Sequence, residues 1–226
     1  GFMRARNSDG SWLEPFDPLS VAGQGFIEGN AWNYSLYVPH DVPALTELVG
    51  GAERLVEWLD SLFVMEVSDE DISGSEDVTR TGMIGNYVHG NEPSHHIPYL
   101  YALAGAPGKT ALRVREIVDT MYRARPDGLC GNDDCGQMSA WYVFSCLGFY
   151  PVCPGSGEYV IGVPCVRSAR VRLPGGREIL IDTEGHRGPG AVIESVLLGA
   201  GEHRGPVISH RDLIEAGRIL YRLGRD

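Results

Sequence analysis

The chain has 226 residues, of which 43% are hydrophobic and 22% are charged, and its formal net charge is −11. These totals fit a globular protein of one or two domains. The acidity, together with the lack of a Lys/Arg cluster, excludes nucleic acid as a partner, and no apolar run reaches the ~18 residues of a membrane span.

Helical periodicity dominates the first two thirds of the chain. Pro39, the pair Gly50–Gly51 and Gly105 are the expected helix ends. The polar, Gly-containing residues 67–91 predict a loop. The segments that predict helices are 31–38, 42–49, 52–63, 93–105, 108–128 and 135–152.

After Pro154 the pattern changes to short β-branched runs separated by Gly and Pro, which predict strands. These runs are 158–164, 168–174, 177–183 and 191–199, and residues 209–224 add a brief helix and a last strand. We therefore expect a mainly α protein, with helical hairpins over 1–153 and a β-rich segment over 154–226.

The five cysteines are an odd number, so at least one thiol has no partner within the chain. Cys130 and Cys135 flank two adjacent acids, but no second cysteine pair completes a zinc site. We expect most of the cysteines to be small buried apolar residues.

Three segments share an unusual composition: "QGFIEGNAWNY", "HGNEPSHHIPY" and "GNDDCGQMSAW". Each contains a Gly-Asn pair and at least one acid, and each leads into an aromatic helix. Helix capping explains any one of them, because Asn and Asp accept hydrogen bonds from free N–H groups at a helix start. Three such segments in one chain favour a functional site instead.

The chemistry that needs such parts is glycoside hydrolysis, which uses one protonated carboxylic acid and one carboxylate. The apolar neighbours of Glu28 suit a general acid. Asp133 and Asp134 repel one another, whereas nearby helix N–H groups favour an ionised base. Side chains suited to holding a sugar are Asn30, Trp32, Tyr34, Asn91, Gln137 and Trp141.

The segment "HGNEPSHH" leaves two metal alternatives open. His89, Glu92, His95 and His96 are possible zinc ligands, but HExxH is absent and Pro93 interrupts the spacing. A hard cation such as calcium, bound by Glu92, Asn91 and backbone oxygens, is the better hypothesis. His95 and His96 are expected either to bond sugar hydroxyls or to be satisfied core residues.

Taken together, these strings resemble glycoside hydrolase family 92, the calcium-dependent exo-acting α-mannosidases. The resemblance rests on "EPFDP", "EGNAWNYSLYVPHDV", "HGNEPSHHIPYLYALAGAPGKT", "PDGLCGNDDCGQMSAWYVFSCLGFYPV" and "GSGEYVIGVP", and it is loose after Gly175. It implies an inverting enzyme with Glu28 as general acid, Asp134 as general base and Ca²⁺ near Glu92 and Asn91. Asn132 stands where relatives often carry another Asp.

The resemblance also implies a β-sandwich domain followed by an (α/α)6 toroid, of which this chain holds the later helices and the closing β segment. We therefore expect a fragment whose N-terminal domain is missing. The expected substrates are mannose-containing oligosaccharides, most often the α-1,2 linkages of mannan or high-mannose N-glycans. The expected location is the periplasm or the cell surface of a bacterium. The alternatives are a calcium-dependent sugar-binding fragment without turnover and a His/Glu metallohydrolase.

Overall fold

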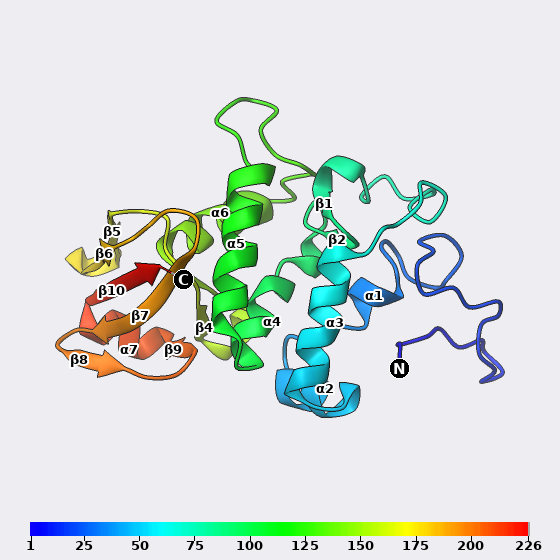
Figure 1. Ribbon diagram of the computed structural model, residues 1–226, viewed down its shortest axis with the longest axis horizontal. Helices are drawn as coiled ribbons and strands as arrows, with labels where there is room; N and C mark the ends of the chain where they lie inside the picture. The colour runs from blue at the N-terminus through cyan, green and yellow to red at the C-terminus, as the bar shows by residue number, and fades with distance from the viewer. Residues whose placement is uncertain (226) are drawn as a thin grey trace. The chain divides into compact units, whose positions relative to one another are not determined.

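The computed structural model describes residues 1–225, which fold into two compact units (Figure 1). The first unit comprises Gly1–Ile97 and Met121–Met138, and the second comprises Pro98–Thr120 and Ser139–Asp226. The predicted boundary at residue 153, between the helical hairpins and the β-rich segment, concerns the longer protein and stays a prediction.

The chain is mixed α/β rather than mainly α, which corrects the predicted fold class. The helices are α1 Ala31–Tyr34, α2 Val42–Val49, α3 Ala52–Val64, α4 Ile97–Leu103, α5 Pro107–Met121, α6 Gln137–Leu147 and α7 His210–Ala216. The strands are β1 Met83–Ile84, β2 Tyr87–Val88, β3 Phe149–Tyr150, β4 Glu158–Ile161, β5 Ser168–Arg172, β6 Glu178–Gly185, β7 Ala191–Leu198, β8 Gly201–His203, β9 Val207–Ser209 and β10 Arg218–Arg225. Four 3₁₀ turns, η1 Arg80–Gly82, η2 Glu92–Ser94, η3 Pro154–Ser156 and η4 Pro174–Gly176, complete the described elements.

In the first unit, the predicted loop over residues 67–91 contains the small antiparallel hairpin β1–β2. Ile84 pairs with Tyr87, so the hairpin loop is Gly85-Asn86. Gly85 has a φ of 60°, and a Cβ there would lie 2.5 Å from the backbone carbon of Phe63 in α3. Glycine is therefore required, since it alone permits both the positive φ and this close approach.

The second unit contains a five-stranded sheet in the order β5-β6-β10-β7-β8. The central strand β10 runs parallel to β6 and antiparallel to β7. A second sheet has the order β3-β4-β9. The sequence missed β8 and β9 because they are three residues each, too short for an alternating pattern to appear.

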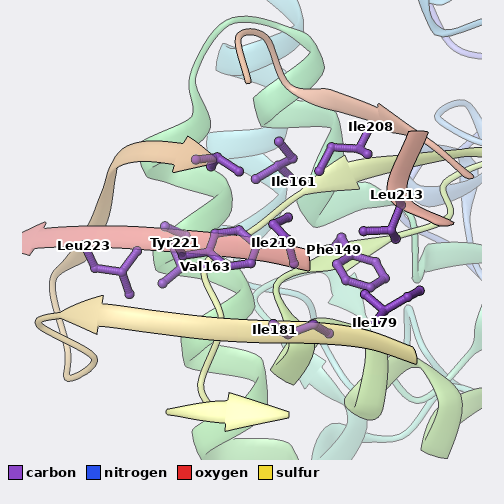
Figure 2. Close-up of a cluster of buried hydrophobic side chains, with 12 residues drawn as sticks. Phe149, Ile161, Val163, Ile179, Ile181, Ile208, Leu213, Ile219, Tyr221 and Leu223 are labelled. Atoms are coloured by element: carbon purple, nitrogen blue, oxygen red, sulfur yellow. The ribbon is translucent and has the colours of Figure 1, made fainter. Parts of the chain in front are cut away.

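The core of the second unit lies where strand, helix and loop side chains meet (Figure 2). Ile181 of β6 and Ile219 of β10 are both fully buried. Leu213 of α7 and Ala111 of α5 belong to the same cluster. Burying such aliphatic groups contributes about 1.5–3 kcal/mol per side chain.

The helix predicted over 135–152 is shorter in the structure, because α6 ends at Leu147. Gly148 has a φ of 94°, a conformation in which glycine commonly terminates a helix. Phe149 and Tyr150 then form β3, which pairs with Ile161 and Val160 of β4. Among residues 1–225, no helix combines the length and apolar character needed to cross a membrane.

Candidate active site

Glu28 lies in the turn immediately before α1, beside two aromatic rings. Phe26 and Tyr34 stack with ring centroids 5.1 Å apart. Gly29 has a φ of 71°, and the Tyr34 ring lies within 2.9 Å of the position that a Cβ would occupy. This packing leaves the Glu28 side chain partly buried, while its neighbour Ile27 is 93% exposed.

Three buried asparagines fix this turn against the β1–β2 hairpin. Asn30 caps α1 through Oδ1, which accepts from the backbone N–H of Asn33. Its Nδ2 donates to Leu19 O at 3.1 Å and to Asn86 Oδ1 at 2.8 Å. Asn33 Nδ2 donates to Asn86 O at 2.8 Å. Since β2 leads directly to Asn91, these bonds hold Glu28 close to the second acidic segment.

A close backbone approach joins the second acidic segment to the third. A Cβ on Gly131 would lie 2.3 Å from the carbonyl oxygen of Gly90, so only glycine fits there. Gly90 in turn donates its N–H to Gly82 O at 3.0 Å. Asn91 and Asn132 directly follow these two glycines, so the loops that carry Glu92 and Asp134 lie side by side.

The turn that carries Asp134 has an unusual backbone. Asp134 and Cys135 have φ values of 39° and 59°, and Gly136 follows at 86°. The carbonyls of Asp133 and Asp134 accept from the N–H groups of Met138 and Gln137 and so close the turn at the start of α6. Positive φ costs a non-glycine residue of order 1 kcal/mol, and such strain concentrates at functional sites.

Carboxyl groups from all three segments meet in this unit. Burial raises the pKa of Glu28 first, and the adjoining carboxyl of Asp77 and the charge of Asp134 raise it further, while the Asn91 amide opposes them. Burial also raises the pKa of Glu92, and the charges of Asp134 and Glu28 add to the effect. Because the charge of Asp134 acts on Glu28, the two acids lie within electrostatic reach of one another, and their catalytic roles stay predictions.

The predicted calcium ligands lie beside other carboxyls: the Asn91 amide adjoins Glu28, and Glu92 adjoins Asp134. Both amide atoms of Asn91 and Oε1 of Glu92 are buried and make no hydrogen bond of normal geometry. Burying such atoms unpaired costs about 1–3 kcal/mol each, so a partner outside the protein fits there. Oxygen donors suit a hard cation such as Ca²⁺. Within residues 1–225, no three His, Cys, Asp or Glu side chains are grouped as a metal site.

The histidines of "HGNEPSHH" are engaged in hydrogen bonds inside the protein. His89 contacts the hydroxyls of Tyr87 and Tyr122 at 2.8 and 2.7 Å through its two ring nitrogens. His95 Nε2 contacts the carbonyl of His89 at 3.0 Å, and His96 Nε2 contacts that of Leu36 at 2.8 Å. Burial lowers the pKa of His95 and of His96 to about 4. These contacts give the zinc alternative no support.

The predicted sugar-binding residues differ in accessibility. Asn30, His95, His96 and Trp141 are at most 4% exposed. Trp141 contacts Tyr99 and Tyr150 inside the second unit. Contact of these four residues with a sugar stays a prediction, but each has a structural role.

Gln137, Trp32 and Asn132 are more accessible. Gln137 is half-buried, and its amide nitrogen lies 3.4 Å from His95 Nδ1. Trp32 is half-buried and packs edge-on against Phe2 and Trp58. Asn132 is exposed beside Asp133 and Asp134. Their contact with a sugar or a catalytic water also stays a prediction.

Sequence reasoning missed Asp77, whose carboxyl adjoins Glu28. It lies in the stretch "SDEDISGSEDVTR", which has four other acids and no aromatic helix after it. Nothing in the pattern distinguishes Asp77 from those neighbours. Only the folding of this loop onto Glu28 identifies it.

Comparison with known proteins places this chain in one family. Residues 1–225 match the model of the glycosyl hydrolase family 92 catalytic domain. The chain is 38% identical to the GH92 α-mannosidase BT3965 of Bacteroides thetaiotaomicron, solved in complex with mannoimidazole, with a TM-score of 0.86 over 100% of this chain and 30% of that one. It is 33% identical to the GH92 inverting mannosidase BT2199 of the same species, with a TM-score of 0.82 over 99% of this chain and 31% of that one.

A curated relative, an uncharacterized secreted glycosidase of the fungus Arthroderma benhamiae, is 26% identical over 100% of this chain. The chain spans 28% of that relative's length and 30–31% of the two solved mannosidases. With a family match that covers residues 1–225, the chain belongs to the glycosyl hydrolase family 92 catalytic domain family.

Proposed function

We propose that the full-length protein is an exo-acting, inverting α-mannosidase in which Glu28 is the general acid and Asp134 the general base. The carrying observation is that these two carboxyls, from turns far apart in the sequence, meet in one partly exposed cluster. The substrates are mannose-containing oligosaccharides, most often the α-1,2 linkages of mannan or high-mannose N-glycans. Family membership and the two solved mannosidase relatives support this class of substrate.

The surroundings of the two acids suit different roles. Burial and the neighbouring negative charges raise the pKa of Glu28, so it keeps its proton to higher pH and can donate it to the leaving oxygen. Asp134 is exposed at the start of α6, where water reaches it. An inverting enzyme needs its base about 6.5–9.5 Å from the acid, which leaves room for the attacking water. In this proposal Asp133 and Asn132 would orient that water.

Asn91 and Glu92 would hold a calcium ion through their side-chain oxygens. When bound, the ion would supply positive charge that orients sugar hydroxyls. Asp77 keeps the proton on Glu28 by placing a second carboxyl beside it. The stacked rings of Phe26 and Tyr34 belong to the turn and helix on either side of Glu28, which is partly buried.

The longer protein would carry a β-sandwich domain before Gly1, and the helices of this chain would be the later part of an (α/α)6 toroid. Residues 1–153 would belong to that toroid and residues 154–226 would close it. The protein would act in the periplasm or at the cell surface. Support comes from the chain's 30% coverage of BT3965 and from the secreted relative.

The test is hydrolysis of an α-1,2-linked mannobiose, whose sugar leaving group needs a proton, by the full-length enzyme and its variants. Glu28→Gln and Asp134→Asn should each lower kcat at least ~100-fold, because each removes a proton-transfer group. Proton NMR of the first product should show β-mannose, the anomer that inversion releases. Chelation with EGTA should lower activity, and added Ca²⁺ should restore it.

Asp41→Asn is a matched control. Asp41 caps α2 through a hydrogen bond from Ala44 N at 3.0 Å, and asparagine keeps this cap. Activity of Asp41→Asn should equal wild type. If Glu28→Gln or Asp134→Asn also retained wild-type kcat, its catalytic role would be excluded. Mannose binding without any turnover by the full-length protein would favour a sugar-binding module instead.

A further inference from the structure

Two of the five cysteines lie together in the second unit. Cys146 is in the last turn of α6 and is buried. Cys165 lies in the segment between β4 and β5 and is partly accessible. Both are free thiols in this structure.

A backbone hydrogen bond joins these two residues directly. The N–H of Cys165 donates to the carbonyl of Cys146 at 3.0 Å. Three residues earlier along the same segment, Gly162 N donates to Gly148 O at 2.8 Å. The Gly148–Gly162 bond continues the register of β3 with β4, whereas Cys146 belongs to the last turn of α6. An N–H···O=C bond of 3.0 Å limits the Cα–Cα distance of Cys146 and Cys165 to under about 7 Å, and disulfides join residues whose Cα atoms lie ~4.4–6.8 Å apart.

The side chains of the two cysteines contact one another as well. The thiol of Cys146 donates a hydrogen bond to Cys165 sulfur, which lowers the pKa of Cys165 and raises the pKa of Cys146. The guanidinium of Arg115 also lowers the pKa of Cys165, and Asp119 opposes it. Arg115 is itself held in place by Asp119 Oδ2 at 2.7 Å and by the carbonyl of Arg187 at 3.0 Å.

The surroundings of the two thiols differ and suit them to different roles. Cys165 is accessible and lies beside a cation, the setting in which a cysteine reacts as a thiolate. Cys146 is buried behind it, against the hydroxyl of Tyr142. One thiol is therefore suited to attack an external disulfide, and the other to resolve the product.

We infer that Cys146 and Cys165 form an intramolecular disulfide when the protein meets a small-molecule disulfide oxidant such as oxidised glutathione. This bond would join the C-terminal end of α6 to the segment before β5. The inference is independent of the proposed mannosidase activity.

The exchange balances in two steps. The Cys165 thiolate attacks one sulfur of oxidised glutathione, forms a mixed disulfide and releases one glutathione thiolate. The Cys146 thiol then loses its proton to solvent and attacks Cys165 sulfur, which expels the second glutathione. The protein loses two protons and two electrons, and the oxidant is reduced to two thiols.

The experiment maps the disulfide in the full-length protein after incubation with oxidised glutathione and blocking of free thiols with N-ethylmaleimide. Trypsin leaves all five cysteines in one peptide, because no Arg or Lys lies between the Arg125–Pro126 bond and Arg167. Chymotrypsin, which cuts after aromatic residues and Leu, separates Cys146, Cys153 and Cys165. Mass spectrometry should find Cys146 joined to Cys165, and reduction should release the two peptides.

The loop closed by this bond is about 20 residues, so oxidation should raise the Tm of the full-length protein. Cys146→Ser should stop the exchange at a glutathione adduct on Cys165, and Cys153→Ser, the control, should still form the bond. Recovery of both Cys146 and Cys165 as maleimide adducts in the oxidised wild type would overturn the inference. So would a bond from either residue to another cysteine.

Discussion

Replacing Asn30 by alanine tests whether this residue supports the fold or contacts substrate. Its side chain is 1% exposed and all of its polar atoms are used within the protein. A structural role predicts a large loss of stability, because the partners of Asn30 stay buried when the amide is removed.

The magnitude follows from the hydrogen bonds that the change removes. Loss of the α1 cap costs about 1 kcal/mol. Asn86 Oδ1, which accepts the Asn30 amide, stays buried and loses this donor, which costs about 1–3 kcal/mol. The bond to the carbonyl of Leu19, which is less buried, contributes about 0.5–1.5 kcal/mol. The expected destabilisation by Asn30→Ala is therefore about 3–5 kcal/mol.

Equilibrium unfolding in guanidinium chloride measures this change, and tryptophan fluorescence reports on the first unit, because Trp32 and Trp58 pack 5.2 Å apart there. Asn7→Ala is the control: Asn7 is exposed, and its amide bonds Ser11 Oγ at 3.0 Å, so the change should cost under about 0.5 kcal/mol. A loss below about 1 kcal/mol for Asn30→Ala, accompanied by a raised KM for mannoside, would refute the structural role and favour direct contact with sugar.

Three further changes test the acid cluster, the strained turn and the core. The pKa of Glu28 is raised above its ordinary value of 4.5, so the folded protein holds the Glu28 proton more tightly than the unfolded chain does. The contribution of this group to stability therefore falls as pH rises through the raised pKa. Glu28→Gln should therefore match wild type below pH 4.5 and be more stable at pH 7, in urea titrations at both pH values; equal stability at pH 7 would contradict the repulsion. Cys135→Gly should stabilise by about 0.5–1 kcal/mol in the same assay, because φ is 59° and the side chain is exposed, and a loss of stability would show that the turn is unstrained. Ile181→Ala should cost about 2–5 kcal/mol, whereas Ile27→Ala, at a 93% exposed position, should cost under about 0.5; similar costs at the two sites would place Ile181 outside the core.

The sequence predicted long elements well, because amphipathic spacing records which face is buried. The helix predicted over 108–128 follows from apolar residues such as Val114, Ile117 and Val118, all of which are buried, but in the structure α5 spans Pro107–Met121 and so ends seven residues early. The end of α6 was predicted wrongly, because "CLGFYPV" is apolar throughout and does not distinguish a buried helix from a buried strand. The positive φ of Gly148 decides that point in the structure.

The site was predictable only where composition signals it. Glu28, Glu92 and Asp134 each stand in a Gly-Asn segment, and the structure brings all three together. Asp77 was not predictable, because its position depends on a loop fold and not on local pattern. Accessibility could not be predicted from the sequence either: Trp141 was predicted to contact a sugar, but it is fully buried.

Helix capping, the alternative to function for the acidic segments, can be assigned to particular atoms. In the first segment the side chain that caps α1 is Asn30, so the carboxyl of Glu28 is not needed for it. In the third segment the backbone carbonyls of Asp133 and Asp134 close the turn. The carboxyl of Glu28 is thus left beside those of Asp77 and Asp134, where burial first and these neighbours next raise the pKa of Glu28, an arrangement that is unfavourable for folding. Several buried amides hold these repelling acids close together. Chemistry on a bound substrate explains this arrangement better than a role in stabilising the helices does.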